Sequence, residues 1–399
     1  MTSVNLPAET VAARVARVRA AALAAGVDAV IVTHLPNVQY LTGFSGSAGS
    51  VIVLPRTCLL VVDFRYVTAV TALTASLDGH VTLATFDGSY DEALVDLLRR
   101  ERSLRIGIEA AYLPVSRFNA ISAGLAARAP LPLESPDGSP VLVPTERLVE
   151  RARIIKDRVE IAALREAGRR LAGVARQLHS FVREGRTERA VAADIESAMR
   201  DAGFSRPAFE TIVASGPNSV LPHARPTDRT IQLGDPTVLD FGGVYDGYCG
   251  DLTRTVQLGA ASAALRQLYV AVAEAQKAAI AAVRPGVASS AIDAAARTVL
   301  ERYGLGAAFG HGTGHGLGLE VHEEPRIARQ SNRLPDQVVE PGMVFTIEPA
   351  AYVPGVGGVR LEDDVLVTDT GCEVLTAEAG GQRLEAGKTQ LFRPPTSDL

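Results

Sequence analysis

The stretch His311-Gly-Thr-Gly-His-Gly-Leu-Gly-Leu-Glu-Val-His322 contains three of the seven histidines of the chain. Its glycines at 312, 314, 316 and 318 argue against a stable helix, because each would cost about 1 kcal/mol there. They favour tight backbone turns instead, which would let imidazoles converge on one point. Imidazole is the commonest metal ligand and the usual acid or base near neutral pH. The stretch therefore predicts a metal or catalytic site, and a glycine-rich surface loop is the alternative.

Two aspartates upstream of this stretch lie in a predicted hairpin. Residues 238–253 read as two strands joined by the Asp-Gly turn signal at 246–247. With that turn, Asp240 faces Thr253 and shares a face with Asp251, since strand side chains alternate with period two. A turn one residue earlier would put Asp240 directly opposite Asp251. Either register brings both carboxylates onto one face.

Two glutamates downstream complete the predicted site. Glu348 ends the apolar run 343–348, and Glu362 lies two residues after Arg360 in a strand-like segment. Four carboxylates that converge without a counter-charge would repel one another and take up protons. Two divalent cations would neutralise them. The complete predicted donor set is Asp240, Asp251, His315, Glu348 and Glu362.

This donor set indicates a pair of divalent metal ions. Oxygen-rich ligation with one nitrogen favours Mn(II), with Co(II), Fe(II) and Zn(II) as alternatives. A two-metal site lowers the pKa of a shared water and polarises a carbonyl, so hydrolysis is the expected chemistry. No serine or cysteine stands in a convincing nucleophile context.

The rest of the chain predicts two domains. Strand-like and helical segments alternate before residue 145, which favours an α/β domain over 1–145. The stretch 130–144 is rich in Pro, Ser and Gly and is the best linker candidate. From residue 150 to 399, helices and strands follow in the order helix–helix, strands, helix–helix, strands. That order suggests two similar halves around one site.

Composition excludes several classes of protein. The net charge of −5 gives no basic footprint for nucleic acid, and no apolar run approaches the twenty residues of a membrane span. The amino terminus lacks the pattern of a signal peptide, and three scattered cysteines do not form a disulfide framework. We therefore expect a cytoplasmic protein that binds neither nucleic acid nor membrane.

Together the motifs resemble those of the pita-bread metallopeptidases, specifically the Xaa-Pro peptidases aminopeptidase P and prolidase. The matching pieces are Asn218–His223, Asp240–Gly243, Asp251–Thr255, His311–Gly318, Val321–Pro325, Thr346–Pro349 and Gly358–Asp363. The resemblance implies an α/β, creatinase-like N-terminal domain and an α+β, pita-bread C-terminal domain with pseudo-twofold symmetry. It also implies a homodimer, as is common in that family.

The resemblance assigns roles to the five predicted ligands. Two carboxylates, Asp251 and Glu362, would bridge the two ions. Asp240 would bind one ion, and His315 and Glu348 would bind the other. Glu348 would also carry the proton of the attacking water.

Four further residues would surround the substrate by the same resemblance: His223, His311, His322 and Arg360. An imidazole there can donate a hydrogen bond to the scissile carbonyl as charge develops on its oxygen. His223 and His322 are the candidates for that task, and the role of Arg360 is to orient a carboxylate or the peptide.

The implied function is hydrolysis of the Xaa-Pro bond at the N-terminus of dipeptides or short peptides. Methionine aminopeptidases share the five ligands but usually lack the N-terminal domain. Creatinase departs from the family at the metal ligands, and non-catalytic pita-bread binding proteins usually lose them. All five are present here, so these three are the weaker alternatives. The choice between a dipeptidase and an aminopeptidase stays open.

Overall fold

The structure, a computed structural model, describes residues 4–101, 105–127, 140–331, 336–377 and 389–391. The chain divides into two compact units, Met1–Arg153 and Ile154–Leu399, with the division inside helix α6 (Leu148–Ile154). Of the predicted linker, residues 130–139 lie outside the described residues. Val141–Pro144 belong instead to strand β6, an edge position that tolerates proline.

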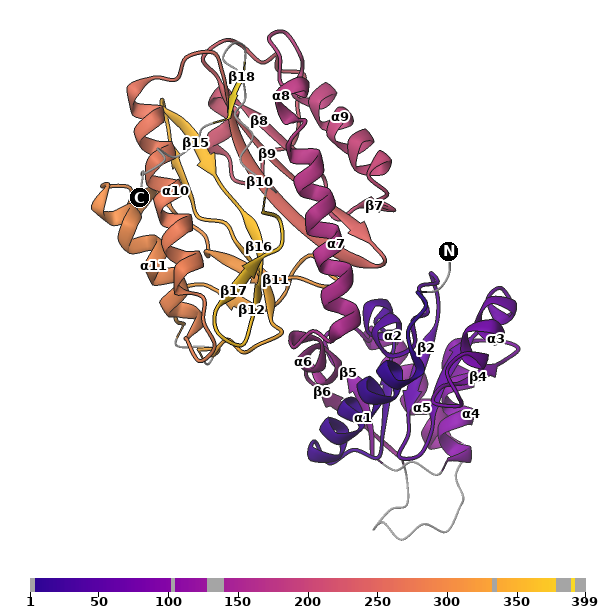
Figure 1. The fold of residues 1–399 in the computed structure, drawn as a ribbon. Coiled ribbons are helices and arrows are strands. Elements are labelled where there is room, and N and C mark those ends of the chain that lie inside the picture. Colours follow the sequence, from indigo (N-terminus) through magenta and orange to yellow (C-terminus); the bar gives the residue numbers. More distant parts are fainter. Residues whose placement is uncertain (1–3, 102–104, 128–139, 332–335, 378–388, 392–399) are drawn as a thin grey trace. The chain divides into compact units, whose positions relative to one another are not determined.

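The first unit is built on one mixed six-stranded sheet, in the order β4-β3-β2-β1-β5-β6 (Figure 1). Its strands are β1 (Ala29–Val32), β2 (Ser50–Val53), β3 (Cys58–Val62), β4 (Thr82–Thr85), β5 (Arg105–Glu109) and β6 (Val141–Thr145). Its helices are α1 (Ala8–Ala24), α2 (Leu35–Thr42), α3 (Val67–Ala75), α4 (Tyr90–Arg100) and α5 (Val115–Ala127). The α/β class predicted from the alternating pattern is confirmed.

The second unit repeats one arrangement twice, with helices followed by a sheet. Its first half has α7 (Arg158–Ala175), α8 (Leu178–Phe181), α9 (Glu188–Asp201), β7 (Arg206–Pro207), β8 (Ile212–Ser215), the short helix η1 (Gly216–Val220), β9 (Pro236–Tyr245) and β10 (Tyr248–Leu258). Its second half has α10 (Ala263–Ala282), α11 (Ser289–Arg302), η2 (Gly306–Ala308), β11 (Gly314–Gly316), β12 (Glu323–Ile327), β13 (Val344–Ile347), β14 (Ala350–Val353), β15 (Gly357–Arg360), β16 (Asp363–Val367) and β17 (Cys372–Val374).

Each half has its own sheet. The first contains β18 (Thr389–Leu391), β10, β9 and β7 in that order, with β8 also paired to β9. The second has the order β12-β11-β13-β16-β17, and β14 pairs separately with β15. The pita-bread α+β fold predicted by the resemblance is confirmed. Among the described residues, no helix is both long and apolar enough to cross a membrane.

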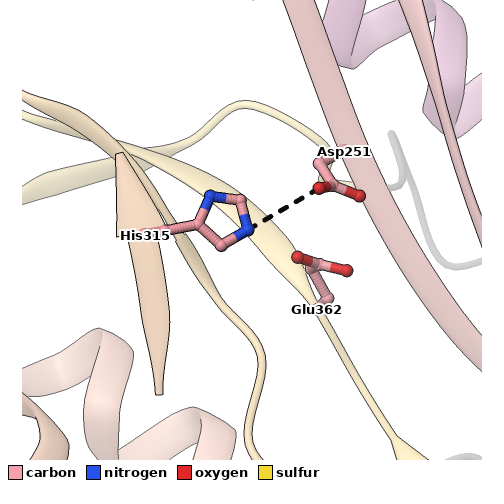
Figure 2. Close-up of side chains that lie close together, drawn as sticks. All are labelled: Asp251, His315 and Glu362. Carbon is pink, nitrogen blue, oxygen red and sulfur yellow. Dashed lines mark ion pairs between the residues drawn. The ribbon is translucent and has the colours of Figure 1, made fainter. Parts of the chain in front are cut away.

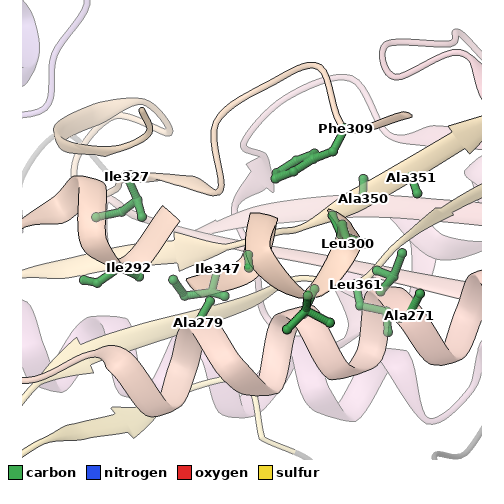
Figure 3. Close-up of a cluster of buried hydrophobic side chains, with 14 of the residues drawn as sticks. Ala271, Ala279, Ile292, Leu300, Phe309, Ile327, Ile347, Ala350, Ala351 and Leu361 are labelled. Atoms are coloured by element: carbon green, nitrogen blue, oxygen red, sulfur yellow. The ribbon is translucent and has the colours of Figure 1, made fainter. Parts of the chain in front are cut away.

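Two apolar cores hold the helices against these sheets. In the first half, residues of α7 and α9 such as Leu171 and Ile195 pack on Phe241 of β9. In the second, Ile292 and Leu300 of α11 belong to the cluster that contains residues of α10 and of β13, β15 and β16 (Figure 3). The helices thus fix the strands that carry the site.

The hairpin β9–β10 has the first of the two predicted registers. Asp246 and Gly247 both have positive φ, 48° and 87°, as a two-residue hairpin turn requires. Asp240 pairs with Thr253, so Asp251 lies two residues further along the same face.

The glycines of the histidine-rich stretch serve a different purpose from the predicted one. None of those at 312, 314, 316 and 318 has positive φ, and Gly314–Gly316 form strand β11. A Cβ on Gly314 would lie 1.8 Å from Thr346 O, and one on Gly316 would lie 2.2 Å from Glu324 O. Gly314 and Gly316 are glycines because neighbouring backbone approaches closely. The predicted tight turns are therefore wrong for residues 314–316, whereas residues 318–322 do bend.

Candidate metal centre

Three of the five predicted ligands point at one another. Asp251 comes from β10, His315 from β11, and Glu362 from the link between β15 and β16 (Figure 2). Their potential ligand atoms all lie within 4.8 Å of one another, and His315 Nε2 is 3.9 Å from Asp251 Oδ2. A single metal ion fits among groups at that spacing.

The other two predicted ligands border this cluster. Glu348 follows β13, and its Oε1 lies 3.8 Å from His315 Nε2. Its backbone N–H donates to Thr313 O at 2.7 Å, which ties it to the start of the histidine-rich stretch. Asp240 accepts a hydrogen bond from the guanidinium of Arg360. The structure therefore brings together carboxylates from both halves of the unit with one imidazole.

The electrostatics of the cluster fit a cation site. Burial, followed by repulsion from neighbouring carboxylates, raises the pKa of Asp251 and Glu362 well above the ordinary range. Burial also raises the pKa of Glu348 to about 8. Asp240 Oδ1 and Asp251 Oδ1 are buried and accept no hydrogen bond from any described residue. Acceptors without a donor, among carboxylates that repel one another, match what divalent cations would satisfy.

His315 is prepared to act as a ligand through Nε2. Its Nδ1 lies 3.1 Å from the carbonyl of Gly316, so a proton on Nδ1 leaves the Nε2 lone pair facing the carboxylates. Its backbone N–H donates to Thr346 Oγ1 at 3.1 Å. Burial, and then the charge of His322, lower the pKa of His315 to about 4. The imidazole is therefore neutral near pH 7, which is the form that binds metals.

Of the three predicted substrate-side histidines, His311 is half-buried, whereas His223 and His322 are exposed. The ring of His322 contacts His315 edge-on, with centroids 4.4 Å apart, and burial lowers its pKa. Burial lowers the pKa of His311 to about 4, and its Nε2 lies 3.3 Å from Tyr352 Oη. His223 is exposed on the loop after η1, and its charge contributes to the lowered pKa of both other histidines.

Arg360 is buried, and its donors are used by the protein itself. Besides Asp240, it donates to Tyr352 Oη at 2.7 Å, Pro222 O at 3.0 Å and Thr253 Oγ1 at 3.2 Å. The side chain thus fixes the direction of the Asp240 carboxylate and holds the loop that carries His223.

Sequence reasoning missed two side chains of the site. Tyr352 links Arg360 to His311, and nothing in the sequence around it signals that role. Asp364 is 1% exposed, and its Oδ2 accepts the backbone N–H of Asp251 at 3.0 Å. The sequence did contain a signal for Asp364. It lies two residues after Glu362, and residues two apart share a face of a regular strand.

A surface pocket of about 700 Å³ lies beside His311. Its lining includes Phe309 and three arginines, Arg297, Arg326 and Arg329. The pocket therefore places an apolar ring and positively charged side chains beside His311, one of the predicted substrate-side histidines.

The chain resembles known peptidases along most of its length. It is 36% identical over 351 residues to the uncharacterised peptidase YqhT of Bacillus subtilis, covering 88% of this chain and 94% of that one. It is 34% identical to the Xaa-Pro dipeptidase of Pyrococcus horikoshii, covering 88% and 93%.

Solved structures agree with the sequence relatives. The Xaa-Pro dipeptidase from Bacillus anthracis superposes with a TM-score of 0.84 at 35% identity, covering 92% of this chain and 97% of that one. The X-Pro aminopeptidase from Thermotoga maritima gives 0.78 at 32% identity, covering 88% and 96%. Residues 14–155 match the creatinase/prolidase N-terminal domain, and residues 162–369 match metallopeptidase family M24. The chain belongs to metallopeptidase family M24, and it is a metallopeptidase.

Proposed function

We propose that this metallopeptidase hydrolyses the bond between an N-terminal residue and proline in dipeptides or short peptides. The reaction uses two divalent cations, Mn(II) by preference, held in a catalytic domain over 150–399 that follows an N-terminal domain over 1–145. The convergence of Asp251, His315 and Glu362, with Glu348 beside them, is the observation that carries the proposal. The names of the relatives from Pyrococcus horikoshii and Bacillus anthracis support the substrate class.

The chain's own residues would divide the chemistry. When bound, the two cations would activate a water and polarise the scissile carbonyl. Glu348 would accept the proton of that water and deliver it to the proline nitrogen, which has no proton of its own in the peptide. His322 and His223 would donate hydrogen bonds to the carbonyl oxygen as its charge develops.

His311 and Arg360 would act around the substrate rather than on the reacting bond. His311 borders the pocket that Arg326 and Arg329 also line. Positive charge at that place suits the free carboxylate of a dipeptide, which favours a dipeptidase over an aminopeptidase that accepts longer peptides. Arg360 would act through Asp240 and Pro222, which are two of the four protein groups that accept its hydrogen bonds.

A reconstitution assay tests this function. Metal-depleted protein is loaded with Mn(II), Co(II), Fe(II) or Zn(II) and given Ala-Pro, Ala-Pro-Ala and Met-Ala. Cleavage of Ala-Pro with bound metal supports the proposal, and preference for Ala-Pro over Ala-Pro-Ala supports the dipeptidase. Preference for Met-Ala would support a methionine aminopeptidase instead. Metal binding without cleavage of any of the three peptides would support a non-catalytic binding protein instead.

The active form is proposed to be a homodimer, following the resemblance stated for the sequence. Light scattering of the metal-loaded protein measures its mass directly. A single 42.0 kDa species across working concentrations would refute the dimer.

A further inference from the structure

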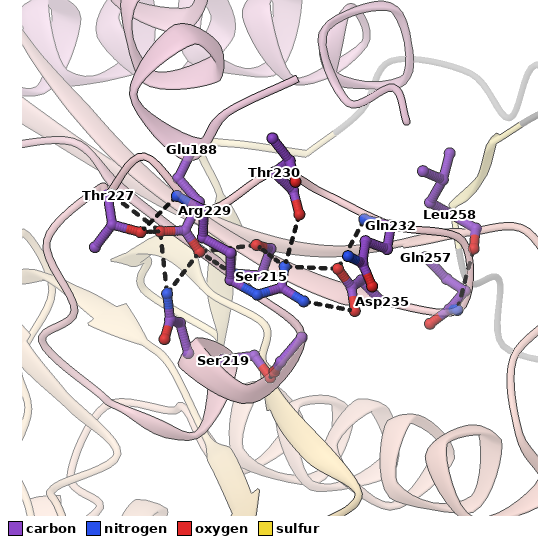
Figure 4. A network of polar contacts seen from close by, with 12 residues as sticks. Glu188, Ser215, Ser219, Thr227, Arg229, Thr230, Gln232, Asp235, Gln257 and Leu258 are labelled. Atoms are coloured by element: carbon purple, nitrogen blue, oxygen red, sulfur yellow. Dashed lines mark hydrogen bonds and ion pairs between the residues drawn. The ribbon is translucent and has the colours of Figure 1, made fainter. Parts of the chain in front are cut away.

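A buried carboxylate far from the metal centre in the chain receives an unusual number of hydrogen bonds. Glu188, the first residue of α9, has no exposed surface (Figure 4). Its Oε1 accepts from Ser215 N and Ser215 Oγ, both at 2.8 Å, and from Asn218 Nδ2 at 3.0 Å. Its Oε2 accepts from Thr227 N at 3.0 Å and Thr227 Oγ1 at 2.6 Å.

These donors bracket one segment, residues 215–227. Ser215 ends β8, Asn218 lies in η1, and Thr227 comes after the loop that contains His223. A single side chain therefore ties both ends of that loop to the start of α9. Fixing them limits the conformations of the residues between, which an exposed loop otherwise samples freely.

The opposite side of the same segment is bound to β15. Ser219 Oγ accepts the backbone N–H of Gly358 at 2.8 Å, and Pro222 O accepts from Arg360 Nη1 at 3.0 Å. A Cβ on Gly358 would lie 1.8 Å from Ser219 O, so the two backbones are in close contact. The segment is thus held between Glu188 and the strand that carries Arg360.

We propose that Glu188 is a positioning residue for substrate binding, because it holds residues 215–227 in the conformation that presents His223 to the peptide. The inference rests on the proposed function in one respect, the role of His223 beside the substrate. Glu188 acts only through this segment, and it touches neither substrate nor metal.

The chemistry of the contacts requires a carboxylate. Every group that Glu188 contacts through its side chain is a donor, so both oxygens must accept. An amide would turn one acceptor into an NH₂ group facing the donors of either Ser215 or Thr227. Although burial opposes the charge, the hydrogen bonds lower the pKa of Glu188 below its ordinary value. The negative charge is also favourable at a helix N-terminus.

The test compares Glu188→Gln with Glu184→Gln, a matched change at an exposed glutamate four residues earlier. Hydrogen exchange of the metal-loaded proteins is followed by mass spectrometry, together with metal content and the kinetics of Ala-Pro cleavage. In Glu188→Gln, exchange in residues 216–227 and KM should each rise about tenfold, the factor expected when a hydrogen bond to a charged group is lost. kcat should stay within about threefold, and metal content should equal that of the control.

The separation of KM from kcat distinguishes positioning from a general structural role. Unchanged exchange in residues 216–227 would overturn the proposal. So would KM and kcat that match those of the control, or a parallel loss of kcat and metal content. If Glu188→Gln does not fold, Thr227→Val decides. It keeps the backbone N–H of Thr227 and removes Oγ1, which donates to Glu188 and accepts from the backbone N–H of Arg229. The same changes in exchange and KM should appear at about two- to fivefold, and their absence overturns the proposal.

Exchange is measured without substrate, so the two hypotheses fail separately. Wild-type protein that binds metal but leaves Ala-Pro intact refutes the proposed function. An exchange pattern in Glu188→Gln identical to that of the control refutes the positioning role, whatever the substrate is.

Discussion

The two halves of the second unit hold their proposed substrate-side histidines, His223 and His311, in the same way but with different chemistry. In the first half, Glu188 on α9 binds the ends of the segment that contains His223. In the second half, Asp293 on α11 accepts from Thr313 N at 3.1 Å and Thr313 Oγ1 at 2.7 Å, two residues after His311. In each half, one acid on the second long helix takes the N–H and the hydroxyl of a Ser or Thr.

The two acids differ in the groups that donate hydrogen bonds to their second carboxylate oxygen. Glu188 is bound by neutral donors alone, whereas Asp293 Oδ2 binds Arg297 Nε at 2.6 Å. Arg297 then donates to Phe309 O at 3.1 Å and to His311 O. A loop held by neutral donors can rehydrate when its acceptor is removed, but a buried guanidinium cannot be left unpaired without a large cost. The second half is therefore the more rigid support.

The largest effect is expected where the two halves meet at the predicted metals. Glu362→Gln keeps the shape of the side chain but removes a charge that the cations would balance. We expect kcat for Ala-Pro to fall by about 10²–10⁴, the range for losing a group that acts in the reaction, and metal content to fall with it. The control is Glu373→Gln on β17, whose side chain is 40% exposed. Full metal content and full activity in Glu362→Gln would remove this residue from the site.

The next prediction compares how much Asp293 and Glu188 each contribute to the free energy of unfolding. Asp293→Asn leaves Arg297 with a neutral partner, in a pair whose side chains are 1% and 10% exposed. The loss of a buried partner should lower the free energy of unfolding by about 3–5 kcal/mol. Urea denaturation measures it, with Glu301→Gln, an exposed change on the same helix, as control. Glu188→Gln should lose less, about 1–3 kcal/mol, because its donors carry no net charge. Equal losses would mean that the cation makes no difference between the halves.

Metal removal tests whether cations hold the halves together. A ligand present at one hundred times its dissociation constant stabilises the folded state by about 2.7 kcal/mol, which corresponds to a Tm shift of about 5–10 °C in a unit of this size. Chelation should lower Tm by that amount in the wild type and by less in Glu362→Gln, in which fewer carboxylates repel. Scanning calorimetry with and without chelator measures both. A Tm that is indifferent to chelation in the wild type contradicts a metal site built from both halves.

These experiments concern residues that the sequence indicated to different degrees. The donors Asp240, Asp251, His315, Glu348 and Glu362 were recognisable because local patterns fixed their neighbours, such as the Asp246–Gly247 turn that sets the register of β9 and β10. The two halves followed from the order of helical and strand-like segments. Local pattern therefore predicted the α/β class of the first unit, the two halves of the second and the set of candidate ligands, whereas the pita-bread fold was predicted from the family resemblance.

What the sequence could not indicate depends on contacts between distant segments. Glu188 contacts Thr227, 39 residues away, and reads in the sequence only as an acid at a helix start. Gly314, in a stretch for which the sequence predicted tight turns, lies in strand β11 and approaches the backbone of Thr346. Tyr352 became part of the site only because its own strand, β14, pairs with β15, the strand that carries Arg360. Such partners are set by tertiary packing, which no local periodicity encodes.

The smallest expected effect is the change in unfolding free energy at acid pH, which measures the contribution of the Glu188 charge alone. The pKa of Glu188 is lowered in the folded state, so the unfolded chain takes up its proton first as the pH falls below the ordinary value of 4.5. The stability that this carboxylate provides is therefore complete above about pH 4.5 and is lost as the pH falls through the lower, folded-state pKa. The difference in unfolding free energy between wild type and Glu188→Gln should be constant from pH 7 to pH 5 and shrink towards pH 3.5. Urea denaturation across that range measures it, with Glu184→Gln as the reference. A difference that does not change with pH would mean that the negative charge of Glu188 contributes nothing to the stability of residues 215–227. The stabilisation would then come only from the packing of its side chain.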